Sequence, residues 1–110
     1  MAIDNRGPFP VEAVRDLLGI TRALYRAELK APPPRADKLR RERLEQIGKN
    51  YRLALELAAK CEAGTMGRRA AWGWAEKATA ALGEFVAESM SDSVRLVDAV
   101  EATAAKLRSA

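Results

Sequence analysis

The chain contains no histidine and only one cysteine among its 110 residues. The lack of histidine excludes the Glu-x-x-His motif of di-iron bundles and every catalytic triad with a histidine base. One cysteine cannot form an internal disulfide, and a lone thiol with carboxylates makes a poor zinc site. We therefore predict no metal, no cofactor and no disulfide framework, and we expect a reducing compartment, the cytoplasm.

Aromatic residues are also scarce, at 5% of the chain, and β-branched residues never alternate with polar ones. This composition offers no strand candidate. No apolar run approaches the roughly 20 residues of a membrane span, and residues 1–10 lack the apolar region of a secretory signal. The chain is instead rich in strong helix formers, with 48% hydrophobic and 31% charged residues. We expect a globular all-α protein that has no membrane partner.

Helix-breaking residues and the spacing of apolar side chains divide the chain into four predicted helices. These helices span residues 10–31, 38–63, 65–88 and 93–108. Three consecutive prolines at 32–34 end the first helix, because proline lacks a backbone donor and crowds the preceding turn. Gly64 follows the second helix, where a glycine readily takes the conformation that closes a helix.

Four helices of this length joined by short turns predict an antiparallel up-down four-helix bundle. We expect a single domain over residues 1–110, with a flexible N-terminus at 1–8 and a proline-rich interhelical turn at 32–36. Residues 89–93 are polar but contain neither glycine nor proline. The alternative is therefore a three-helix protein, in which the third and fourth helices are continuous.

The two tryptophans lie two positions apart in the third predicted helix, which separates them by about 200° around its axis. Trp74 aligns with Ala71 and Phe85 and is assigned to the core. Trp72 then falls on a polar side, beside Arg68. An exposed tryptophan often marks an interface, so we expect Trp72 at a protein contact. The alternative is that Trp72 folds over the end of the bundle.

Other apolar residues also fall outside a narrow core stripe. The first helix carries two adjacent apolar stripes, which is more than one neighbouring pair of helices needs. The candidate interface residues are Trp72, Leu53, Leu17, Ile20 and Leu24. Closed twofold dimers are the commonest way to cover an apolar patch of this kind. We therefore expect a homodimer, or a complex with another protein.

The third helix carries a further stripe, made of small residues. Its members are Gly73, Ala80, Gly83 and Ala87. Such residues would let another backbone approach closely, although the abundance of alanine in the chain is an equally good explanation.

The formal net charge of +4 arises within one segment, residues 30–43. The candidate basic patch consists of Arg35, Lys38, Arg40, Arg41 and Arg43. No aromatic residue lies in this segment to stack on a base. An up-down bundle would also bring it beside the acidic residues Glu84, Glu88, Asp92 and Asp98. We do not expect nucleic acid to be the partner. Residues 64–69 place amides and two arginines at a helix start, where an anion could bind, although a simple turn is preferred.

These observations favour a small non-catalytic module for protein interaction or homo-oligomerisation, with no catalytic residue assigned. One alternative is a small metal-free enzyme that uses arginine, lysine and carboxylate electrostatics. Another is a weak nucleic-acid binder that uses residues 30–43. A concave pocket with converging charged groups would favour the enzyme, whereas a flat apolar patch around Trp72 and the first helix would favour binding.

Overall fold

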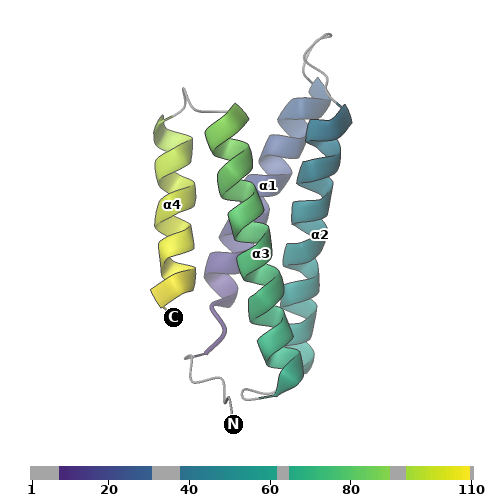
Figure 1. Ribbon diagram of the computed structural model, residues 1–110, viewed down its shortest axis with the longest axis vertical. Helices are drawn as coiled ribbons and strands as arrows, with labels where there is room; N and C mark the ends of the chain where they lie inside the picture. Colours follow the sequence, from purple (N-terminus) through teal and green to yellow (C-terminus); the bar gives the residue numbers. More distant parts are fainter. Residues whose placement is uncertain (1–7, 31–37, 62–64, 90–93, 110) are drawn as a thin grey trace.

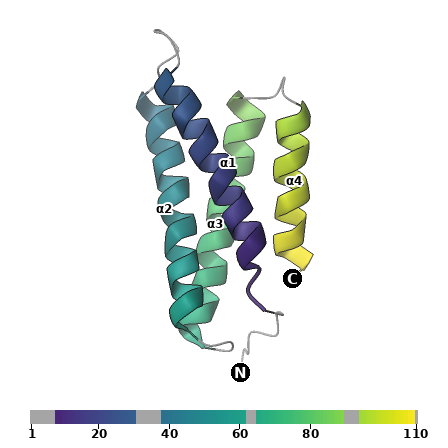
Figure 2. The same cartoon turned by 180° about the vertical axis from the view of Figure 1, so that it is seen from behind.

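The computed structural model describes residues 8–30, 38–61, 65–89 and 94–109, and these form four antiparallel helices (Figure 1). The helices are α1 (Val11–Lys30), α2 (Lys38–Lys60), α3 (Met66–Ser89) and α4 (Val94–Ser109). Each runs opposite to its predecessor, and from behind α1 crosses between α2 and α4 (Figure 2). The up-down four-helix bundle is confirmed. Because α3 ends at Ser89 and α4 begins at Val94, the three-helix alternative is wrong.

The helix ends follow the local chemistry of the sequence. The Pro10 carbonyl accepts the first hydrogen bond of α1 from the Val14 amide at 3.1 Å, so proline stands at the entrance as expected. The Thr65 hydroxyl accepts the Arg68 amide at 3.2 Å and caps α3. α2 ends at Lys60, earlier than the predicted 63. The predicted proline-rich turn, and residues 1–7 of the predicted flexible N-terminus, lie outside the described residues.

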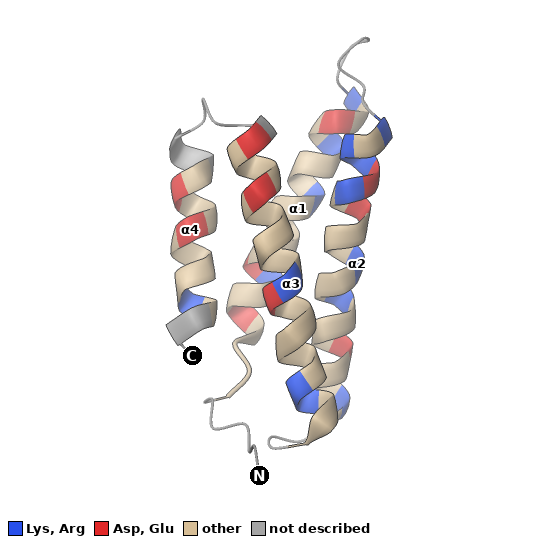
Figure 3. Cartoon of the chain, viewed as in Figure 1, with Lys and Arg blue, Asp and Glu red and all other residues tan. Residues whose placement is uncertain are grey.

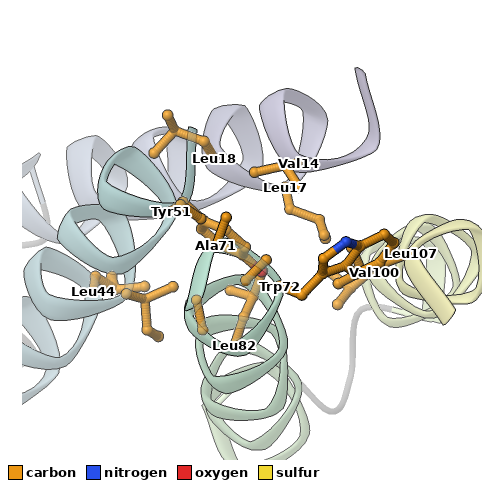
Figure 4. Packing of buried hydrophobic residues seen from close by; sticks show 14 of the residues in the cluster. Val14, Leu17, Leu18, Leu44, Tyr51, Ala71, Trp72, Leu82, Val100 and Leu107 are labelled. Atoms are coloured by element: carbon orange, nitrogen blue, oxygen red, sulfur yellow. The ribbon is translucent and has the colours of Figure 1, made fainter. Parts of the chain in front are cut away.

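The core draws on all four helices. Leu17 of α1, Leu44 and Tyr51 of α2, and Leu82 of α3 have almost no exposed surface (Figure 4). α4 adds a buried stripe of Val100, Ala104 and Leu107, at spacings of four and three residues. α2 and α3 form the most extensive helix pair, while α4 packs more lightly, against α1 and α3. No helix among the described residues combines the length and apolar character that a bilayer crossing requires.

One buried polar group joins α2 to α3. The Tyr51 hydroxyl lies 2.8 Å from the Thr79 Oγ1, and that hydroxyl donates to the Ala75 carbonyl at 2.7 Å. Since a threonine hydroxyl has one hydrogen, Tyr51 is the donor of the first bond. Burial raises the pKa of Tyr51 to about 12, because the phenolate would lose its hydration.

The expected positions of the two tryptophans were wrong. Trp72 is only 3% exposed, and its ring centroid lies 5.3 Å from that of Phe9. Its indole points toward Val100 and Leu107 of α4 (Figure 4). Trp74 is half-buried instead, and the Lys77 ammonium lies 5.2 Å from its ring centroid. Trp72 is thus a core residue that joins α3 to α4.

The error has a simple geometric cause. α3 packs against α1 and α4 as well as α2, so its buried arc is wider than the single stripe on which Trp74 was placed. Trp72 belongs to a second buried stripe with Ala75, Leu82 and Val86, at spacings of three, seven and four residues. The polar residues that were aligned with Trp72, among them Arg68, Arg69 and Glu76, lie outside that stripe.

The same argument applies to the wide apolar face of α1. This helix contacts α2, α3 and α4, and Leu17 and Leu24 are buried within the single chain. Ile20 packs against the core as a partly buried residue, and Leu53 is half-buried. Trp72, Leu17 and Leu24 are therefore buried within the single chain and do not form an exposed apolar patch, while the expected interface itself stays a prediction.

Candidate functional site

A groove of about 540 Å³ runs between α3 and α4. Its lining consists of Glu76, Thr79, Ala80, Gly83 and Glu84 from α3 and Val100, Glu101, Ala104 and Leu107 from α4. The hollow exists because the facing positions of α3 are small. A Cβ placed on Gly83 would meet no heavy atom within 4 Å, so nothing from the described chain covers this position. The buried side chains of Val100 and Leu107 give the groove an apolar floor.

The charged residues that line this groove all have the same sign. They are Glu76, Glu84 and Glu101, and all three are exposed. Glu84 and Glu101 have no ion-pair partner among the described residues. Figure 3 shows acidic positions on the upper parts of both α3 and α4, while basic positions are densest on the upper part of α2 and also occur lower on α3 and α4. The groove therefore combines an apolar floor with an acidic rim.

A second hollow, of about 400 Å³, lies between α1 and α2 around Gly48. Three exposed cations surround it: Arg22, Lys49 and Arg52. The Tyr25 hydroxyl donates to the Glu45 Oε1 at 2.8 Å, and this hydrogen bond raises the pKa of Tyr25.

Most of the described basic patch is engaged with acidic or aromatic neighbours. Arg40 Nη2 lies 2.6 Å from Oε1 of the buried Glu28, and Arg43 Nη1 lies 3.1 Å from Glu88 Oε2. Both guanidinium groups also stand over the Phe85 ring, at 5.5 and 5.4 Å from its centroid. The expected acidic neighbour is confirmed for Glu88, while the role of Glu28 was missed.

The remaining basic residues are less informative. Lys38 Nζ lies 3.9 Å from Glu42 Oε1, and Arg41 is half-buried. Arg35 lies outside the described residues. The ion pairs of this patch that cross between helices are Arg40–Glu28, from α2 to α1, and Arg43–Glu88, from α2 to α3.

The turn between α2 and α3 uses its arginine for structure. The Arg68 guanidinium donates to the carbonyl oxygens of Ala58 and Cys61, at 2.9 to 3.0 Å. Ala58 lies in the last turn of α2 and Cys61 directly follows it, at the end of the helix where a cation also complements the helix dipole. Arg68 is therefore turned toward α2, which removes one of the two cations from the anion site considered at this turn.

Comparison of the chain with family models, with curated proteins and with solved structures finds no match. Within the described ranges, no three acidic or cysteine side chains come close enough together to hold a metal ion. Functional inference thus depends on the geometry of the two hollows and the surface charges.

Sequence reasoning found part of the groove. Ala80 and Gly83 belong to the small-residue stripe, which suggested close approach by another backbone. Glu101 and Ala104 were not recognised, because their relation to Gly83 depends on how α4 is rotated against α3. The spacing of Val100, Ala104 and Leu107 indicates which face of α4 is buried, and the glutamate next to Val100 was a usable signal, but this spacing does not say which positions of α3 that face meets.

Proposed function

We propose that this protein is a non-catalytic interaction module that holds a segment of another protein in the groove between α3 and α4. The observation that carries the proposal is the groove itself, about 540 Å³ with an apolar floor and no covering side chain at Gly83. Concave apolar sites of this size are the usual places for ligands and partner segments. The cytoplasm suits the single, half-buried Cys61.

The metal-free enzyme is less well supported. The site that such an enzyme would use is the hollow between α1 and α2, which is lined by Arg22, Glu45 and Lys49. A catalytic acid or base works best with a pKa near the operating pH. The pKa values of Tyr25 and Tyr51 are shifted the other way, further above neutrality. Nucleic-acid binding is also less well supported, because Arg40 and Arg43 are already paired.

A twofold dimer across the groove is disfavoured by charge. A twofold interface brings the same patch of each copy together. Glu84 and Glu101 of one copy would then face the same acidic groove on the other, and like charges across an interface oppose association. We therefore propose another protein as the partner. Light scattering at micromolar concentration should give the mass of one chain, and a stable twofold dimer would contradict this choice.

The groove can be filled by substitution without disturbing the core. Gly83→Leu places a side chain in the hollow, and its Cβ meets nothing within 4 Å. Gly19→Leu is the matched control, because Gly19 is also an open helical glycine but lies on α1, outside the groove. Both variants should fold at least as stably as the parent, since leucine is a better helix former than glycine.

The test is chemical crosslinking of the tagged full chain in its native cells, followed by identification of the crosslinked proteins. We expect a partner that crosslinks to the parent and to Gly19→Leu but not to Gly83→Leu. A partner set that is the same for all three chains would show that the groove is not the binding site. The absence of any specific partner would contradict the proposed function as a whole.

A further inference from the structure

We infer that the segment held between α3 and α4 is a basic amphipathic helix of another protein, with lysine or arginine on both sides of an apolar stripe. This inference rests on the function proposed above and specifies its partner. It is drawn from the juxtaposition of an apolar floor with three glutamates, and no basic side chain lines the groove among the residues whose side chains the structure describes.

The dimensions of the groove suit about two turns of helix. Its α3 wall extends from Glu76 to Glu84, which corresponds to about 12 Å at the rise of an α-helix. Apolar residues at positions i, i+3 or i+4, and i+7 of a partner helix span a similar length on one face. Ala80 and Gly83 offer little steric bulk, so the partner's backbone can come close to α3.

The charges lie on both edges of the groove. Glu84 belongs to the α3 edge and Glu101 to the α4 edge, so each flank of an inserted helix faces a carboxylate. Lysine and arginine suit these flanks, since their aliphatic stems can cover apolar surface while their charged ends reach the rim. A helix with acidic flanks would be repelled, which gives the groove a means of discrimination.

A second copy of this chain does not meet the same requirements. Its basic surface lies mainly on α2, and its own apolar helix faces are already buried in the bundle. Insertion of α2 into the groove of a neighbour would also be a head-to-tail contact, which leads to open chains of molecules rather than a closed dimer. A separate basic helix is the occupant that fits both the floor and the rim.

The test is a fluorescence anisotropy titration of the full chain with labelled synthetic helices of 14 residues. The probe peptide carries leucine along one stripe and lysine elsewhere, and the comparison peptide replaces every lysine with glutamate. The double variant Glu84→Gln with Glu101→Gln removes two of the three rim charges, one from each edge, and is called the rim variant. The control, Glu12→Gln with Glu56→Gln, removes the same net charge from exposed positions on α1 and α2.

We expect saturable binding of the lysine peptide, weakened on the order of tenfold by the rim variant and less than twofold by the control variant. Gly83→Leu should weaken it at least as much as the rim variant does. If the control and rim variants lose affinity equally, binding is general charge attraction and the inference is wrong. Equal affinity for the glutamate peptide would also overturn it.

The design separates the inference from the function on which it rests. If Gly83→Leu removes binding while the rim variant does not, the groove remains a docking site but its preference for a basic helix is refuted. If Gly83→Leu binds the lysine peptide as tightly as the parent, this groove does not hold the helix. The inference then fails. The proposed function fails with it only if the crosslinked partner is also unaffected by Gly83→Leu.

Discussion

Trp72→Ala should be among the most destabilising single substitutions in this protein. The indole is 3% exposed and fills the space bounded by Phe9 and the α4 residues Val100 and Leu107. A buried tryptophan removes about 150–250 Å² from water, and truncation to alanine in a core costs about 3–5 kcal/mol. Domains have total stabilities of about 5–15 kcal/mol, so this loss is a large fraction of the whole.

Urea unfolding followed by far-ultraviolet circular dichroism measures this effect, because the signal does not depend on the deleted indole. Trp74→Ala is the matched control on the same helix. That side chain is half-buried under Lys77, so its removal should cost about 1–2 kcal/mol. Trp72→Phe keeps a ring at the site and provides a measurable variant even if Trp72→Ala fails to fold.

The opposite result would restore the surface position first expected for Trp72. If Trp72→Ala loses less than about 1 kcal/mol, or less than Trp74→Ala, the indole is not buried between α3 and α4. The rotation of α3 described above would then be wrong, and so would the contact that positions α4. The groove lies between these two helices and would lose its structural basis.

Two further predictions concern the glycines and Tyr51. Gly83→Ala should stabilise the fold by about 0.5–1 kcal/mol, because alanine is a better helix former and its Cβ meets no neighbour. Gly67→Ala should destabilise the fold by about 1–3 kcal/mol, since the new Cβ at position 67 would overlap the Cys61 side chain. Thermal unfolding of the two variants should show melting temperatures that move in opposite directions. The pKa of Tyr51 is about 12 in the folded chain and about 10 in the unfolded chain. This difference contributes about 2–3 kcal/mol to the free energy of unfolding, which is fully present below pH 10 and is lost as the pH rises toward 12. A Tyr25→Phe variant retains Tyr51 as its only tyrosine, and its ultraviolet titration should show ionisation near pH 12 while the chain is folded. Ionisation near pH 10 in the folded chain would contradict the burial of this hydroxyl.

Local signals in the sequence predicted the helices well. The prolines that begin at Pro32 follow α1, Thr65 caps α3, and Val100, Ala104 and Leu107 form the buried face of α4. Each of these features depends on residues close together in the chain. Their physical causes, backbone hydrogen bonding and the 3.6-residue period, act within a single helix.

The errors occurred where several helices determine one position. Trp72 appeared exposed because polar residues such as Arg68 and Glu76 share its helical face, but the width of the buried arc on α3 depends on where α1 and α4 lie. Arg40 was expected beside acidic residues of the third and fourth helices, yet it pairs with Glu28 from the preceding helix. The groove depends on the rotation of α4 against Gly83 in the same way. Helical spacing within one element does not contain this information.

The most direct test of the account is to locate a bound basic helix on the full chain by nuclear magnetic resonance. The ¹⁵N-labelled protein is titrated with the unlabelled leucine–lysine peptide, and the amide shifts of the described helices are followed. The account predicts saturable changes centred on Ala80, Gly83 and Ala104, at the floor of the groove. Changes centred instead on Gly48 and Lys49, in the hollow between α1 and α2, would contradict it, as would the absence of any saturable change.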